Sequence, residues 1–269
     1  MENVLELIKS RRSVRTFDGQ DVDSSQKEKL LSFAQSAANP FGLEIRYRYL
    51  DVVEEKLNCP VVLGTRLFLA AAMKKQPRAE EAFGYSFESV VLYAQQLGLG
   101  TLWVGGTMDR AAFERALGLE DGEFMPCVSP IGYKADKMSV RESLMRKGIK
   151  ADSRMDFEEL FFDESFDKPL SRDKPGKLAP ALEAVRLSPS AVNKQPWRLL
   201  VSDGTVHFCL KRSKGFAAGA IDMQKIDMGI AMCHFELCAR ELGFQTGFSI
   251  ESSVPVEEGM EYIASFIMR

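Results

Sequence analysis

Three arginines and a serine stand within five residues near the N-terminus, in the stretch Arg11-Arg12-Ser13-Val14-Arg15. A guanidinium group can hold a phosphate through two parallel hydrogen bonds and stays charged at any physiological pH, and a serine hydroxyl adds a neutral donor. If the stretch is extended, its side chains alternate, and Arg11, Ser13 and Arg15 share one face. The stretch therefore predicts a binding site for an anion such as a phosphate. The alternative is a solvated basic patch near a chain end.

A second stretch with polar groups suited to binding covers residues 188–197, with the sequence SPSAVNKQPW. Its two prolines restrict the backbone, and its hydroxyls and amides offer donors and acceptors that suit the polar edge of a planar heterocycle. The alternative is a helix-capping turn, in which serine and asparagine bond local backbone groups and Trp197 lies in the core. The residues alone leave both interpretations open.

The spacing of apolar residues predicts the elements that must position these stretches. In the first half, helices are expected from residue 4 to Ser10, from Ser24 to the Asn39-Pro40 pair, from Phe83 to Leu97 and after Asp109. Strands are expected at 44–53 and 101–104, and an apolar segment at 124–133. The alanine-rich run 66–73 fits either state, and a charged stretch, 134–154, leads out of this half.

The second half begins with an acidic and aromatic segment and then follows the same pattern. A helix is expected at 178–187, and strands at 197–201 and 206–210 flank a turn with Asp203-Gly204, which indicates a hairpin. A long helix that ends at Gly243 and a closing strand at 262–268 complete the chain.

Short matches between the halves occur in the same order and against the same expected elements. The matched pairs are Ser36-Ala37-Ala38-Asn39 with Ser190-Ala191-Val192-Asn193, Leu97-Gly98 with Leu242-Gly243, and Phe17-Asp18 with Phe166-Asp167. We therefore expect an internal duplication, with a first half at 1–155 and a second at 156–269 that pack as a pseudo-dimer within one chain.

Composition excludes several classes of protein. The 269 residues allow one or two domains. The net charge of −3, from 35 basic and 38 acidic residues, gives the chain no overall positive field that would attract nucleic acid. The five cysteines form no CxxC pair, so we expect reduced thiols and a cytoplasmic protein. Neither a secretory leader nor a membrane span is expected.

A metal site is not expected either. His207 falls in an apolar strand and His234 within a helix, and the chain has no HExxH motif and no cluster of histidine and cysteine ligands. Although Cys233 and Cys238 are close to His234, we interpret it as a core histidine whose nitrogens are hydrogen-bonded.

Together, RRSVR and PSAVNKQPW resemble the nitroreductase family of flavoproteins, over most of both halves. The resemblance implies an α+β fold in which each half has a mainly antiparallel sheet flanked by helices. In that family the arginine motif and the PSxxN loop of two protomers meet at one FMN. Here the first half has the arginines, but its loop at 36–41 matches the PSxxN motif only in part. The second half has the full loop, but Asp163-Glu164-Ser165-Phe166 stands where the arginines are expected. An anionic phosphate would be repelled there, so one working site and one degenerate site are expected.

The resemblance also assigns roles to residues. Arg11 would pair with the FMN phosphate, Ser13 would bond the ribityl or pyrimidine edge, and Arg15 would lie beside N1 and the C2 carbonyl, where a cation raises the reduction potential. The remaining cofactor-binding residues implied are Arg12, Val104, Gly105 and Gly106 in the segment under the flavin, a second phosphate-binding Arg154, and Pro189, Ser190, Asn193 and Gln195 in the loop.

The function implied is that of an FMN-dependent NAD(P)H oxidoreductase. Flavin N5 would accept hydride from NADH or NADPH and pass electrons to a nitroaromatic, a quinone or a related small molecule in ping-pong turnover, with no catalytic side chain. The chain would be a monomer that acts as a pseudo-dimer. Two alternatives remain: an FMN-binding carrier or sensor without turnover, and a flavin-free protein whose arginines contact a protein or a nucleic acid.

Overall fold

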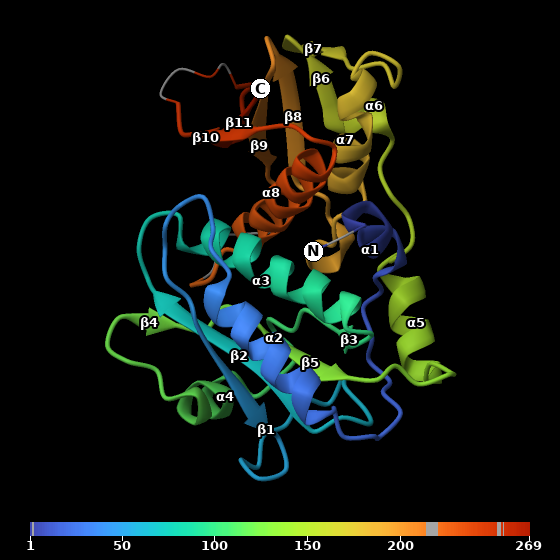
Figure 1. Ribbon diagram of the computed structural model, residues 1–269, viewed down its shortest axis with the longest axis vertical. Coiled ribbons are helices and arrows are strands. Elements are labelled where there is room, and N and C mark those ends of the chain that lie inside the picture. Colours follow the sequence, from blue (N-terminus) through green and yellow to red (C-terminus); the bar gives the residue numbers. More distant parts are fainter. Residues whose placement is uncertain (2, 214–219, 252–253, 255) are drawn as a thin grey trace. The chain divides into compact units, whose positions relative to one another are not determined.

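The computed structural model describes residues 1, 3–213, 220–251, 254 and 256–269. The chain forms two compact units, each with its own sheet and helices (Figure 1). We call Ser10–Lys150 the N-terminal unit, and Ala151–Arg269 together with Met1–Lys9 the C-terminal unit.

The N-terminal unit has a largely buried sheet with the strand order β1-β2-β5-β3, in which every neighbouring pair is antiparallel. Helices α2 and α3 pack against each other. In chain order the elements are α2 (Ser24–Ser36), β1 (Arg46–Asp51), β2 (Leu67–Lys74), α3 (Ala79–Gln96), β3 (Gly100–Thr101), α4 (Arg110–Leu117), β4 (Glu123–Phe124), which pairs with β2, β5 (Val128–Gly132) and α5 (Val140–Gly148).

The C-terminal unit has a sheet with the order β10-β11-β9-β8-β6-β7, which is antiparallel except for the parallel pair β6 and β8. Helices α7 and α8 pack against each other. The elements are α1 (Val4–Ser10, through Lys9 in this unit), α6 (Phe157–Leu160), β6 (Phe161–Asp163), β7 (Ser165–Pro169), α7 (Ala179–Arg186), β8 (Trp197–Ser202), β9 (Thr205–Lys211), α8 (Met223–Glu241), β10 (Thr246–Ser249) and β11 (Met260–Met268), with short 3-10 turns at Gly176–Leu178 and Ala191–Asn193.

The two units repeat one plan. Each runs helix, antiparallel strand pair, long helix and then further sheet strands, and the sheet order β1-β2-β5-β3 corresponds to β8-β9-β11-β10. The expected α+β fold with two similar halves, each with a mainly antiparallel sheet flanked by helices, is therefore confirmed.

Local sequence explains where the main elements begin and end. The Asp23 carboxylate caps α2 by accepting the N–H groups of Ser25 and Gln26. The β8–β9 hairpin turns at Asp203 and Gly204, whose φ angles of +46° and +72° suit a tight two-residue turn. These signals are local, so the sequence predicted both elements.

Two expectations about elements were wrong in detail, and one helix was not predicted. The strand expected at 101–104 is only Gly100–Thr101, with an isolated bridge from Val104 to Val128. Helix α2 ends at Ser36, before the Asn39-Pro40 pair. The charged stretch contains the helix α5.

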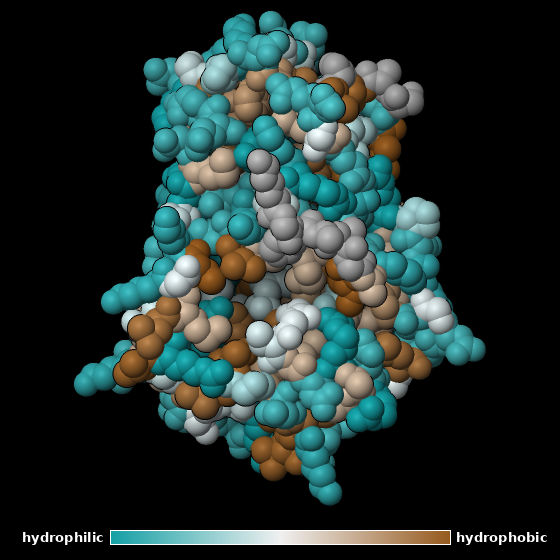
Figure 2. Space-filling view, turned by 180° about the vertical axis from the view of Figure 1, so that it is seen from behind, coloured by the Kyte–Doolittle hydropathy of each residue, from teal (hydrophilic) through white to brown (hydrophobic). Residues whose placement is uncertain are grey.

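The surface of α5 explains why this helix was missed. Figure 2 shows one face of the molecule covered mostly by hydrophilic residues, with hydrophobic ones in separate patches. On α5, Val140 and Leu144 are 78% and 64% exposed, so the helix has no buried apolar stripe for sequence periodicity to reveal. Within the described residues, no helix is long and apolar enough to cross a membrane.

Candidate functional site

The arginine stretch, residues 11–15, lies beside a glycine-containing segment of the N-terminal unit, residues 99–106. The backbone N–H of Val14 donates to the carbonyl oxygen of Thr101 at 2.8 Å, and Ser13 forms a parallel bridge with Thr101. A Cβ added to Gly100 would lie 3.0 Å from the Val14 side chain, so a larger residue at this position would force Val14 to shift. Two of the predicted site stretches are thus brought together within one unit.

Arg11 is a buried cation, only 7% exposed. Its Nε has no hydrogen-bond partner among the described residues, and the nearest carboxylate oxygen, Glu88 Oε1, lies 3.8 Å from it. Burial lowers the pKa of Arg11, and the charge of Glu88 opposes that shift. A buried guanidinium with an unused donor is the chemistry of an anion site.

Arg15 is half-buried, and its Nε is likewise without a hydrogen-bond partner in the described part of the chain. Burial is the main cause that lowers the pKa of Arg15. The negative charge of Glu142 opposes this shift, and the positive charge of Arg146 adds to it. Arg12 is exposed and donates to the carbonyl oxygen of Arg11 at 2.9 Å. The stretch therefore turns two of its three arginines inward.

The segment after β3 is held by backbone and arginine contacts. Val104 is buried and exchanges two backbone hydrogen bonds with Val128, at 2.9 and 3.0 Å. Arg110 Nη2 donates to the carbonyl oxygen of Gly105 at 2.5 Å. A Cβ built on Gly106 would meet no atom within 4 Å, so open space lies beside this residue.

In the C-terminal unit, the PSAVN loop has an unusual backbone. Val192, Asn193 and Gln195 have φ angles of +50°, +56° and +48°, and such a conformation is rare for a β-branched residue such as Val192. The backbone N–H of Ala191 donates to both carboxylate oxygens of Asp227, at 2.9 and 3.1 Å. Strained backbone of this kind is concentrated at ligand sites.

The polar side chains of this loop bond nearby backbone groups. Gln195 Oε1 accepts the N–H of Met155 at 2.9 Å, and Asn193 Nδ2 donates to the carbonyl oxygen of Ser153 at 3.1 Å. Arg154 donates to the carbonyl oxygens of Ala151, Ser153 and Leu187 at 2.9, 2.7 and 3.3 Å. The loop and the segment with Arg154 are therefore tied together by contacts between residues 40 positions apart, which are not the local backbone bonds of a capping turn.

Trp197 and His234 belong to the core of the C-terminal unit. Both are fully buried, and Trp197 Nε1 has no hydrogen-bond partner among the described residues. His234 Nδ1 lies 2.9 Å from Ser188 Oγ and 3.0 Å from the carbonyl oxygen of Ala184. The interpretation of His234 as a hydrogen-bonded core residue is confirmed. Across the described ranges, no three His, Cys, Asp or Glu side chains group as metal ligands.

In the acidic stretch 163–166, which stands where arginines are expected, the charge of Asp163 is neutralised by two lysines. Asp163 is 4% exposed, and its carboxylate oxygens lie 2.5 Å from the ammonium groups of Lys168 and Lys174. These lysines hold the pKa of Asp163 below its usual range. The repulsion expected for a phosphate there is thus reduced by two cations.

Three residues near the arginine stretch escaped the sequence reasoning: Glu88, Trp103 and Arg146. Glu88 Oε2 accepts the indole N–H of Trp103 at 2.7 Å, and Arg146 lies close enough to lower the pKa of both Arg11 and Arg15. The one available signal was an acidic residue at 88 within an apolar stretch of helix. For Arg146, in a charged segment, the sequence carried no signal.

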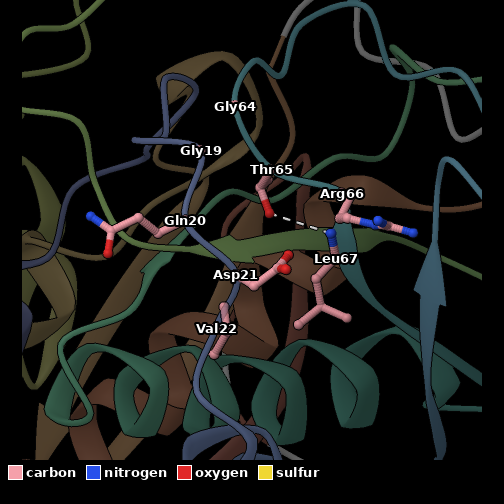
Figure 3. Close-up of a pocket in the computed structure, with 8 residues that line it drawn as sticks. All are labelled: Gly19, Gln20, Asp21, Val22, Gly64, Thr65, Arg66 and Leu67. Carbon is pink, nitrogen blue, oxygen red and sulfur yellow. Dashed lines mark hydrogen bonds between the residues drawn. The ribbon is translucent and has the colours of Figure 1, made fainter.

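A cavity of about 320 Å³ elsewhere in the N-terminal unit is lined by none of these residues. Figure 3 shows its lining, from Gly19 to Val22 and from Gly64 to Leu67. Arg66 at its edge is already paired, with Asp51 at 2.5 Å and Glu54 at 3.1 Å. The cavity is therefore separate from the arginine site.

A protein-family model described as "Putative TM nitroreductase" matches residues 3–239. The chain belongs to this nitroreductase family. A solved structure from Thermotoga maritima described as a "putative nitroreductase" is 18% identical to this chain, with 99% of this chain and 94% of the other covered and a TM-score of 0.65. Their fold is therefore shared over nearly the whole length.

Shorter matches cover about half of this chain. A nitroreductase with bound FMN from Bacteroides fragilis is 20% identical, over 52% of this chain and 92% of its own, with a TM-score of 0.44. An FMN-dependent nitroreductase from Clostridium difficile is 20% identical, over 52% and 94%, with a TM-score of 0.43. None of the curated proteins compared with the chain matches it.

Proposed function

We propose that this protein binds one FMN and acts as an NAD(P)H oxidoreductase on a nitroaromatic, a quinone or a related small acceptor. The observation that carries the proposal is the buried guanidinium of Arg11, with an unused Nε donor, in a stretch bonded to Thr101. Bound FMN would supply the redox chemistry, taking hydride from NADH or NADPH and delivering electrons to the acceptor in ping-pong turnover.

The arginine stretch fits a phosphate. Burying a guanidinium is costly unless its donors find acceptors, and phosphate oxygens are strong acceptors. Arg11 would hold the phosphate, with Ser13 as a neutral donor and Arg12 at the exposed side. The unpartnered Nε of Arg11 supports this assignment.

Arg15 would act on the electronics of the cofactor. Its half-buried cation would lie beside the pyrimidine edge of the flavin, where negative charge accumulates on reduction. A cation in a partly desolvated place has a stronger effect than one in water, so Arg15 would raise the reduction potential. Val104, Gly105 and Gly106 would line the ring, and the open space beside Gly106 supports this assignment.

The C-terminal unit would supply further contacts to the same FMN, from Pro189, Ser190, Asn193 and Gln195, with Arg154 as a second cation for the phosphate. The left-handed backbone at Val192 and Asn193, held by Asp227, supports a binding role for this loop. Since both units contribute, we infer that the chain needs no second copy and acts as a monomer.

Reduction by a nicotinamide under anaerobic conditions tests the proposal. The purified protein, loaded with FMN, should be yellow, and NADH or NADPH should bleach it; a quinone or nitroaromatic should then restore the colour. Bound flavin that neither donor reduces would identify a carrier or sensor instead. A colourless protein that takes up no FMN would overturn the proposal.

A further inference from the structure

Glu88 carries a carboxylate into the interior of the N-terminal unit. It lies in the middle of α3 and is fully buried, with Phe83 and Phe87 on the same helix. A charge in such a place is costly unless it is paired and hydrogen-bonded, so its contacts show what it stabilises.

The two carboxylate oxygens of Glu88 serve different groups. Oε2 accepts the indole N–H of Trp103 at 2.7 Å, while Oε1 lies 3.8 Å from Nε of Arg11. The Trp103 ring itself packs against Phe87 and Phe83, with centroids 4.9 and 6.2 Å away. Trp103 therefore fixes the carboxylate, and the carboxylate faces the guanidinium.

The longer of these distances matters for the chemistry. At 3.8 Å the carboxylate attracts the guanidinium but does not take its Nε–H in a hydrogen bond. Arg11 is thereby compensated in charge while its buried Nε makes no hydrogen bond within the described residues. A direct bidentate pair would have used the fork that a phosphate requires.

We propose that Glu88 is a positioning residue, which keeps the Arg11 guanidinium buried and directed at the phosphate of FMN. This inference rests on the function proposed above. It assigns a role in cofactor selection to a residue outside both motifs, because the effect of Glu88 on the ligand would pass through Arg11, and Arg11 would contact the phosphate. Riboflavin, which has the same ring and ribityl chain but no phosphate, isolates that group.

The variant Glu88→Gln tests the proposal, because the amide can still accept the indole N–H but presents no charge to Arg11. FMN binding should weaken about tenfold, part of the loss expected when a charged hydrogen bond is disturbed. Riboflavin binding should stay within about twofold of wild type, and in an Arg11→Ala background Glu88→Gln should cause no further loss of FMN affinity.

Glu81→Gln is the matched control. Glu81 is on the same helix, is 1% exposed and pairs with Arg78 at 3.0 Å, so its loss also breaks a buried ion pair. This variant should unfold at a lower temperature and keep wild-type FMN affinity. If Glu88→Gln does not fold, Glu88→Asp retains the charge one methylene further from Arg11 and should show the same selective loss.

The outcomes separate this inference from the proposed function. Equal losses of FMN and riboflavin, unchanged FMN affinity in both Glu88 variants, or additive effects with Arg11→Ala would show that Glu88 is structural only. A wild-type protein that binds neither flavin would instead overturn the proposed function itself.

Discussion

The backbone N–H of Val14 donates to the carbonyl oxygen of Thr101 at 2.8 Å, so the arginine stretch and the glycine-containing segment after α3 run side by side. Residues far apart in the sequence thereby meet in one unit. Arg11 is buried at this place with an Nε donor that has no partner among the described residues, and the proposed phosphate site depends on it.

Arg11→Ala should weaken FMN binding about ten- to a hundredfold, because a hydrogen bond to a charged group contributes about 1.5 to 3 kcal/mol. Fluorescence titration of the apoprotein measures the affinity. The control is Arg141→Ala, since Arg141 is exposed and donates to the carbonyl oxygen of Pro60. Equal FMN affinity in Arg11→Ala and wild type would remove Arg11 from the phosphate site.

The asparagines of the two related loops should differ in role. Asn193→Ala should weaken FMN binding, because Asn193 is in the left-handed part of the proposed flavin loop. Asn39 donates to the carbonyl oxygen of Leu43 at 2.7 Å and to Ser86 Oγ at 3.1 Å, so Asn39→Ala should lower the unfolding temperature and leave FMN affinity unchanged. The reverse pattern would contradict the assignment of the working loop.

Asp227 should make the stability of the protein depend on pH. Burial raises its pKa well above the usual value of 3.8. The folded state therefore holds the proton more tightly than the unfolded state, and Asp227 lowers the free energy of unfolding as the pH rises from about 4 towards the folded-state pKa. Asp227→Asn cannot ionise, so its stability relative to wild type should increase over this range. Denaturant unfolding at several pH values measures the difference, and a constant difference would contradict the shift.

The cysteines should differ sharply in reactivity. Cys59 is partly exposed, whereas the other four are buried, and burial raises the pKa of Cys209 to about 12 and of Cys238 to about 11. Since the thiolate is the reactive form, a thiol reagent should label Cys59 first in the folded protein and all five after denaturation. Peptide mapping identifies the labelled residue; early labelling at Cys209 would contradict the buried core.

Much of this fold could be predicted because its signals are local. The stripe from Phe83 to Leu97 and the Asp203-Gly204 turn specify α3 and the β8–β9 hairpin within a few residues. The alanine-rich β2 and the helix α5 were not predictable from apolar periodicity. Strand β2 is buried along nearly its whole length, and the buried residue of α5 is the polar Glu142, while its apolar Val140 and Leu144 are exposed.

The site was predictable only in part. Three arginines in five residues indicated an anion site, and the structure buries Arg11 there. Its countercharge, Glu88, comes from another element, and no local pattern connects the two. Arg154 likewise donates to the carbonyl oxygen of Leu187, a residue distant in the sequence, so no local pattern predicts this hydrogen bond.

Equilibrium titration of the apoprotein with FMN, read as cofactor bound per chain, tests the central claim most directly. The arginine stretch of one unit and the PSAVN loop of the other are proposed to serve the same cofactor, so we expect one FMN per chain, with affinity lost in both Arg11→Ala and Asn193→Ala. Two FMN per chain, or none, would contradict the account.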